Sequence, residues 1–318
     1  MVDKPLLGYK EIVVEEGYFI SPKSVLRFQV ERADVHCAVV NSLRLVILRE
    51  RKWMDVVVSR WSSDSHTLPV AWGEIGPTLE DVGCLLRLPM LGKVDPSSGR
   101  LSPSQQGVVD ALRKSIHLEK GLNGVKKDQS EVKKGHSGVK NTFTEWARYW
   151  YKDMGASKAG EEAHVVTDGP GLKEPVHLAA FLAYWLTWYI FPGPPKDGVD
   201  TTLLELTAIL ASWESVPLAS LFLGTLFKRL DILPEVARRS CGRYDLPIYV
   251  ATNFLHMFLF ERFLRVAPEP NSFGADDGEG KGEPCRNVCQ SARWSGSGVW
   301  DVRGSIVDVL DVEGEFVA

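Results

Sequence analysis

Apolar residues recur along most of this chain at the three- and four-residue spacing that is typical of helices. The spacing is clear from Asn41 to Arg60 and again in the second half of the chain. A short helix is also expected over 21–32, where Ser21 would cap it and Pro22 would take the first helical position. The later helices are expected at about 201–212, 217–230, 234–241 and 247–265, with Leu233-Pro234 as one of the breaks.

One segment departs from this spacing and predicts a β-hairpin near residues 66–78. Its sequence, "HTLPVAWGEIGPT", alternates in polarity, and Pro69 and Pro77 bracket two short strands around a tight turn. Prolines confine such strands to sheet edges. A helix is expected to follow at once, because Thr78 and Asp81 have the spacing of a capping box. Its apolar stripe comprises Leu79, Val82, Leu85 and Leu86, and Pro89 would end it.

Two aromatic-rich segments are expected to supply core. "LAAFLAYWLTWYIF", Leu178 to Phe191, is uncharged but shorter than the ~20 apolar residues that span a bilayer. We therefore interpret it as a buried helix and expect no membrane span. "NTFTEW" begins another helix, with Thr142 and Glu145 as a second capping box. The aromatic stripe of that helix comprises Phe143, Trp146, Trp150 and Met154.

Two further segments lack the pattern of a packed helix. Residues 113–140 hold eight Lys/Arg, three acids and no aromatic residue, so a mobile basic insertion is expected there. Beyond Ala267, "PEPNSFGADDGEGKGEP" has the composition of a linker. The later run "VWDVRGSIVDVLDV" is compatible with a strand but too short to form a core alone. Most of the tail is therefore expected to be disordered unless this run docks elsewhere.

The predicted fold is mainly α, a single multi-helix domain with one small β-hairpin and a disordered C-terminal tail. Strands and helices do not alternate, which argues against a doubly wound parallel sheet. We expect an N-terminal extension over 1–39, a helical domain over 40–266, and an acidic Gly/Pro-rich linker and tail over 267–318.

Composition and charge narrow the class of protein. The chain has 318 residues, of which 44% are hydrophobic and 25% charged, as in soluble globular proteins. A net charge of −4 does not favour nucleic acid as a partner of the whole chain. The five cysteines are scattered and odd in number, so no disulfide framework is expected. The acidic N-terminus does not resemble a secretory signal, and a nuclear or cytoplasmic location is expected.

Sequence motifs of common catalytic chemistries are absent. The chain has no Gly-rich nucleotide loop, H-E-x-x-H or G-x-S-x-G motif, and no lysine is singled out as a pyridoxal-phosphate ligand. Cys285 and Cys289 lack a second pair of ligands for zinc. Glu161 and His164 lie in a glycine-flanked loop. We therefore expect no cofactor and no metal site.

His66 and Glu74 are the best acid–base candidates, because a hairpin would bring them within reach of each other. In the alternative interpretation, His66 hydrogen-bonds locally and Glu74 satisfies turn or helix amides. His177 and His256 lie on apolar helices and are expected to be core or rim histidines. The basic insertion would contact phosphate only through weak, non-specific electrostatics, since it lacks stacking aromatics. Its candidate residues are Lys126, Lys127, Lys133 and Lys134.

The run "RWSSDSHTLPVAWGEIGPTLEDVGCLLRLPMLG", Arg60 to Gly92, resembles the plant mobile domain, a family also described as aminotransferase-like. The stretches "HLAAFLAYWLTWYIFP" and "FLHMFLFERF" are similar in the same order, so the resemblance covers about residues 40–265. Leu68 replaces an aromatic usual in the family, and the basic insertion is additional; both suggest a divergent or transposon-derived copy. The matching motif residues are Trp61, His66, Thr67, Pro69, Trp72, Gly73, Glu74, Thr78, Leu79, Asp81, Val82, Pro89 and Gly92.

This resemblance implies a plant protein from a family shared by transposable elements and host genes. Host members of the maintenance-of-meristems type are nuclear and act in transposon silencing, gene expression and meristem maintenance, with a phosphoprotein-phosphatase-like partner. The word aminotransferase in the family name carries no established activity. The leading hypothesis is a non-enzymatic protein-interaction module. The alternatives are a DNA-associated transposon accessory protein and a hydrolase or transferase that uses His66 and Glu74.

Overall fold

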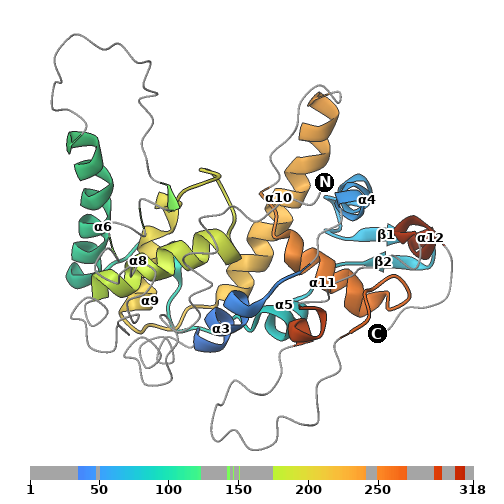
Figure 1. The fold of residues 1–318 in the computed structure, drawn as a ribbon, viewed down its shortest axis with the longest axis horizontal. Coiled ribbons are helices and arrows are strands. Elements are labelled where there is room, and N and C mark those ends of the chain that lie inside the picture. Colours follow the sequence, from blue (N-terminus) through green and yellow to red (C-terminus); the bar gives the residue numbers. More distant parts are fainter. Residues whose placement is uncertain are drawn as a thin grey trace, which may run out of the picture. The chain divides into compact units, whose positions relative to one another are not determined.

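The computed structural model describes residues 35–47, 51–122, 142–143, 146, 150, 175–240, 249–270, 290–295 and 305–311. Within these ranges it contains nine α-helices and one two-stranded antiparallel sheet (Figure 1). The prediction of a mainly α fold with one small hairpin is confirmed. The helix expected at 21–32, the Glu161/His164 pair and the Cys285/Cys289 pair lie outside the described residues.

The chain divides into two compact units, each of which combines segments that are far apart in the sequence. The first unit comprises Met1–Ala33, Val94–Trp188 and Pro192–Val216. The second comprises Asp34–Lys93, Tyr189–Phe191 and Pro217–Ala318. The whole Arg60–Gly92 motif therefore belongs to the second unit.

Three helices form the centre of the first unit. α8 (Pro175–Trp185) packs against α9 (Leu204–Ala211), and both contact α6 (Pro103–Leu122). Every residue of α8 from Leu178 onward is buried, which confirms the prediction of a core helix. A π-helical turn, Leu186–Ile190, continues it. Two 3-10 turns, Pro96–Ser98 and Thr201–Leu203, also lie in this unit. Among the described residues, no helix combines the length and the apolarity that crossing a bilayer requires.

The predicted aromatic stripe packs on α8. Phe143 makes edge contacts with Tyr184 and Trp188, at ring-centroid distances of 5.0 and 4.7 Å. The Trp146 indole N–H donates to the carbonyl of Ala180 at 3.0 Å. Glu145 and Met154 lie outside the described residues, so the second capping box stays a prediction.

Helix α6 corrects the expected start of the basic insertion. We predicted a mobile segment from residue 113, but the helix continues to Leu122. The packed face of the helix continues past residue 113: Val109 and Leu112 are buried before it, and after it Ser115 is buried and Ile116 is half-buried. Arg113, one helical turn after Val109, lies 3.1 Å from Glu205 of α9. Residues 123–140, including the four candidate lysines, lie outside the described residues.

The second unit surrounds helix α5 (Leu79–Leu86), which contacts α3 (His36–Arg44), α10 (Leu218–Ser240) and α11 (Thr252–Arg262). α4 (Arg51–Arg60) packs against α10 and against strand β1 (Leu68–Val70), which pairs with β2 (Gly73–Ile75). α11 is buried throughout its middle, from Phe254 to Phe260. The largest wholly buried side chains of this unit include Trp53, Trp294, Phe222, Phe254, Phe258, Phe260 and Phe263.

Two helix boundaries differ from the sequence prediction. The pattern from Asn41 to Arg60 belongs to two helices, α3 and α4, and the chain between them is not helical at 45–47. Conversely, α10 runs unbroken through Pro234, where two helices were expected. A proline removes one helical hydrogen bond. Here Leu226 and Leu230 are buried before it, and Glu235 pairs with Arg238 and Arg239 after it, which stabilises both flanking turns.

The C-terminal tail contributes two packed pieces to the second unit. A 3-10 turn, Gln290–Trp294, buries Ser291 and Trp294. Helix α12 (Ile306–Asp311) buries Ile306 and Leu310. The run was compatible with a strand, but its residues 306–311 form a helix, in which Ile306 and Leu310 lie one turn apart on one face. The run does dock elsewhere, and it orders part of a tail that was otherwise expected to be disordered.

Candidate functional site

The β1–β2 hairpin presents the polar residues of the Arg60–Gly92 motif. Leu68 pairs with Ile75, Pro69 with Glu74 and Val70 with Gly73. Leu68 and Ile75 are buried on one face, while Pro69 and Glu74 are exposed. Gly76 follows β2 where the chain passes the carbonyl of His66, and a Cβ atom there would lie 2.9 Å from that oxygen. A side chain at this position would force the two segments apart.

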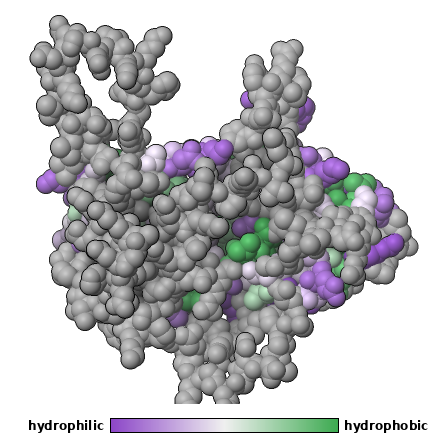
Figure 2. Space-filling view, viewed as in Figure 1, coloured by the Kyte–Doolittle hydropathy of each residue, from purple (hydrophilic) through white to green (hydrophobic). Residues whose placement is uncertain are grey.

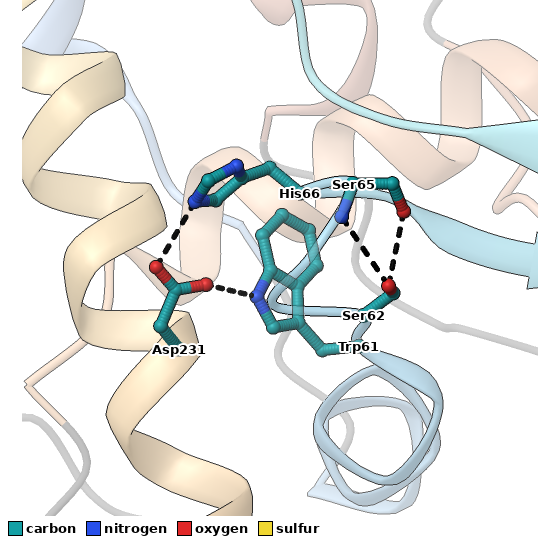
Figure 3. Close-up of polar contacts among 5 residues, drawn as sticks. All are labelled: Trp61, Ser62, Ser65, His66 and Asp231. Carbon is teal, nitrogen blue, oxygen red and sulfur yellow. Dashed lines mark hydrogen bonds and ion pairs between the residues drawn. The ribbon is translucent and has the colours of Figure 1, made fainter.

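His66 lies at the start of the hairpin and pairs with α10 rather than with Glu74. Its Nε2 is 3.1 Å from Oδ2 of Asp231, and the other carboxylate oxygen of Asp231 accepts the Trp61 indole N–H at 2.8 Å (Figure 3). The imidazole also stacks on Phe227, with ring centroids 5.1 Å apart. His66 has a φ of +55°, in the left-handed region, so backbone strain accompanies this orientation.

Glu74 belongs to a separate chain of hydroxyl groups. Its Oε2 accepts a hydrogen bond from the Thr67 hydroxyl at 2.7 Å, and Thr67 Oγ1 lies 2.6 Å from Ser65 Oγ. Ser65 in turn donates to Ser62 at 3.0 Å (Figure 3). Among the described residues, His66 and Glu74 therefore form no hydrogen bond with each other. The predicted acid–base pair is replaced by two independent contacts, of which His66–Asp231 is long-range and Thr67–Glu74 crosses the hairpin.

The capping box at the start of α5 is confirmed. Thr78 Oγ1 accepts from the Asp81 amide at 3.2 Å, and Asp81 Oδ2 accepts from the Thr78 amide at 2.8 Å. The sequence did not reveal a further partner, Arg262 at the end of α11. Its guanidinium donates to the other oxygen of Asp81 at 2.7 Å and lies 5.5 Å from the centre of the Phe258 ring. One buried carboxylate thus caps α5 and connects it to α11.

The remaining motif residues pack or lie at the surface. Trp72, in the hairpin turn, contacts the edge of Phe263 with ring centroids 6.2 Å apart. α5 ends at Leu86, where Arg87 takes a left-handed conformation with a φ of +57°, so the helix ends before Pro89 rather than at it. The Pro89 carbonyl accepts the Ala219 amide of α10 at 3.0 Å. Val82 is completely buried, Leu79 is half-buried and Gly92 is exposed. Apart from its exposed members, the motif therefore joins the hairpin and α5 to α10 and α11.

Comparison with known families matches residues 37–308 to the plant mobile domain. The chain belongs to the plant mobile domain family. No curated protein and no solved structure matches this chain. The matched range continues past residue 266, where we expected the helical domain to end, and it includes Trp294 and Ile306 of the packed tail segments.

Two histidines of this plant mobile domain lie on apolar helices, as predicted. His256 is completely buried, stacks on Trp53 at 6.0 Å and places its Nδ1 2.7 Å from the Thr252 carbonyl. It is a core histidine. His177 is half-buried and packs against the edge of Trp150, with ring centroids 5.4 Å apart.

The tail segment 290–295 is held by polar side chains of the same plant mobile domain. Glu261 of α11 accepts the Trp294 indole N–H at 2.7 Å and a second bond from Arg293 at 3.3 Å. Ser291 donates to the side-chain oxygen of Asn41, whose amide group donates to the Leu85 carbonyl of α5 at 3.1 Å. The signal for this docking was a tryptophan in a segment of otherwise linker-like composition.

Metal binding by His, Cys, Asp and Glu side chains was also considered. In the part of the chain that the structure describes, no three of these residues are grouped closely enough to hold an ion. The nucleic-acid interpretation rests on lysines outside that part and stays a prediction.

Proposed function

We propose that this plant mobile domain is a protein-interaction module rather than an enzyme. The observation that carries the proposal is the use of its polar motif residues in the architecture. His66 is bonded to Asp231, Glu74 accepts from Thr67, and Asp81 caps α5 while it pairs with Arg262. These contacts hold the hairpin and α5 on α10 and α11. The two acid–base candidates, His66 and Glu74, are thus each occupied by a structural hydrogen bond.

The proposed setting follows from the family. We propose a nuclear protein that acts in transposon silencing, gene expression or meristem maintenance through a phosphoprotein-phosphatase-like partner. Exposed large apolar side chains are the natural contact points for such a partner. In the second unit, Leu91 is 85% exposed and Val46 is 68% exposed.

Affinity capture from plant nuclear extract tests the partner. The tagged full chain is expected to recover a phosphatase-like protein, identified by mass spectrometry. Leu91→Ser and Val46→Ser variants serve as matched surface probes, because neither side chain contributes to the core. If one variant recovers less of the phosphatase-like protein while its circular dichroism spectrum is unchanged, the substituted side chain lies in the contact with the partner. Repeated capture without any phosphatase-like protein would refute the proposed partner.

A structural role for the His66–Asp231–Trp61 cluster predicts a loss of stability when its carboxylate is removed. Asp231→Ala leaves the Trp61 indole N–H and the His66 imidazole without their shared acceptor. We expect the free energy of unfolding to fall by about 1–3 kcal/mol, measured by urea denaturation. Asp231→Asn retains one acceptor oxygen and is expected to lose less. Glu235→Ala, on the same helix but in exposed pairs, should have the smallest effect.

A catalytic role for the cluster would give a different pattern. In that case Asp231→Asn would abolish an activity while leaving stability almost intact. Equal stability of the wild-type, Asp231→Ala and Glu235→Ala chains would contradict the structural role. The comparison therefore separates the interaction-module proposal from the hydrolase or transferase alternative.

A further inference from the structure

We infer that α4 and the turn of the β1–β2 hairpin form a docking surface for a short helix, and that α12 occupies this surface as a tethered, exchangeable ligand. α12 contacts α4 directly, and its Leu310 bonds to Ala71 in the hairpin turn. The inference names one binding surface of the proposed interaction module and rests on that proposal for its biological use. Its physical basis lies in the contacts of α12 itself.

Two aliphatic side chains seat the helix. Ile306 and Leu310 are 4% and 0% exposed, and their four-residue spacing places them on one face of α12. The opposite face remains at the surface, where Val307 is 39% exposed and Asp308 is exposed. Figure 2 shows hydrophobic side chains at the surface in the region of α12, at the right of the view. The surface thus selects an apolar pair one turn apart.

Two polar contacts fix the end of the helix. The Ala71 amide donates to the Leu310 carbonyl at 3.0 Å. Arg60 forms a two-pronged pair with Asp311, in which each guanidinium nitrogen lies 2.8 Å from a different carboxylate oxygen. The guanidinium holds the pKa of the Asp311 carboxyl below its ordinary value. Together these contacts recognise the sequence Ile-x-x-x-Leu-Asp in helical form.

The small size of this contact makes exchange possible. α12 has six residues, and a helix of that length is not stable in water without a surface to pack on. Only two of its side chains are buried, whereas α11 buries seven consecutive residues. The Arg60–Asp311 pair is exposed to solvent and contributes less than a buried pair would. α12 can therefore leave its seat while the core of the second unit stays folded.

Native-state hydrogen exchange of the full chain tests whether α12 opens alone. Ala71 and Ala219 are matched reporters, since each amide donates to a backbone carbonyl at 3.0 Å in the same unit. Exchange at Ala71 reports release of α12, and exchange at Ala219 reports separation of α10 from Pro89, which follows α5. The protection factor of Ala71 is expected to be at least ~10-fold lower than that of Ala219. Equal protection of the two amides would overturn the inference.

A labelled peptide of residues 301–318 tests recognition in trans. A full-length Leu310→Asp variant, with its own α12 released, is expected to bind the peptide at least ~10-fold more tightly than the wild-type chain. Adding Arg60→Glu should abolish binding of this peptide, and a peptide with Asp311→Arg should restore it. No binding by a folded Leu310→Asp variant, or binding that ignores the charge reversal, would overturn the inference.

If Leu310→Asp fails to fold, Arg60→Glu alone still tests the inference, because Arg60 is the last residue of α4 and its side chain is partly exposed. This variant is expected to lower the protection of Ala71 but not of Ala219, and Arg60→Glu with Asp311→Arg should recover it. Val307→Asp, on the outer face of α12, should leave the protection factors of both amides unchanged. An unchanged protection factor at Ala71 in the Arg60→Glu variant would count against the docking surface. None of these measurements involves the phosphatase-like partner. The docking surface can therefore fail its tests while the partner proposal stands, and the reverse also holds.

Discussion

Replacing Trp294 by alanine is expected to lower the free energy of unfolding by about 3–5 kcal/mol, the usual loss for a large aromatic side chain in a core. Trp294 is only 1% exposed, although it lies in a tail with the composition of a linker. Its ring packs against Phe260 at 5.4 Å, and its indole N–H donates to Glu261. The substitution would leave both a cavity beside α11 and a carboxylate with one fewer donor.

Urea denaturation followed by circular dichroism provides the measurement. Trp213→Ala is the matched control, because Trp213 is 42% exposed and lies in the other unit. The free energy of unfolding of Trp213→Ala is expected to fall by no more than about 1 kcal/mol. Trp294→Phe should recover part of the stability by filling most of the cavity without the hydrogen bond. If Trp294→Ala were as stable as the control, the tail would not be part of the core.

The sequence predicted those features whose interactions are local. The hairpin follows from alternation and prolines, and the start of α5 follows from the spacing of Thr78 and Asp81. The apolar stretch in α8 is recognised by its length and its lack of charge. In each of these cases, all the information lies within about fifteen residues.

The partners of the motif residues were not predictable in this way. His66 meets Asp231 at a separation of 165 residues, and Asp81 meets Arg262 at 181. A spacing rule along a helix or hairpin carries no information about such pairs. His66 and Glu74 were paired in the prediction because both lie on the hairpin. The fold instead satisfies Glu74 within the hairpin and His66 from α10.

Local composition was also a poor guide where tertiary packing decides. Lysines and glycines suggested a mobile segment from residue 113, yet buried Leu112 and Ser115 hold α6 in place. Pro234 suggested a break, yet α10 is anchored on both sides of it. The Gly- and acid-rich tail suggested disorder, yet Trp294 and Leu310 are buried. Packing overrides propensity in all three segments.

Removing the carboxylate of Asp81 is expected to produce the second large effect. Asp81→Ala removes one of the two capping-box bonds, the one donated by the Thr78 amide, and takes from the mostly buried Arg262 guanidinium the carboxylate that pairs with it. The side chains of Asp81 and Arg262 are only 10% and 23% exposed. We expect the free energy of unfolding to fall by about 2–4 kcal/mol in total, less than for a completely buried pair. Glu80→Ala, on the exposed side of the same helical turn, should cost only a few tenths.

A double-mutant cycle separates the two contributions of Asp81. If the pair with Arg262 matters as the structure indicates, Asp81→Ala with Arg262→Ala should be less destabilised than the sum of the single variants, because each single variant already loses the interaction between the two side chains. The loss that remains in the double variant then reflects the cap on α5 and the packing of Arg262 on Phe258. The free energy of unfolding of Asp81→Asn should lie between those of the wild type and Asp81→Ala, since asparagine keeps an acceptor for the Thr78 amide. Additive single losses would show that α5 and α11 are held together by apolar packing alone.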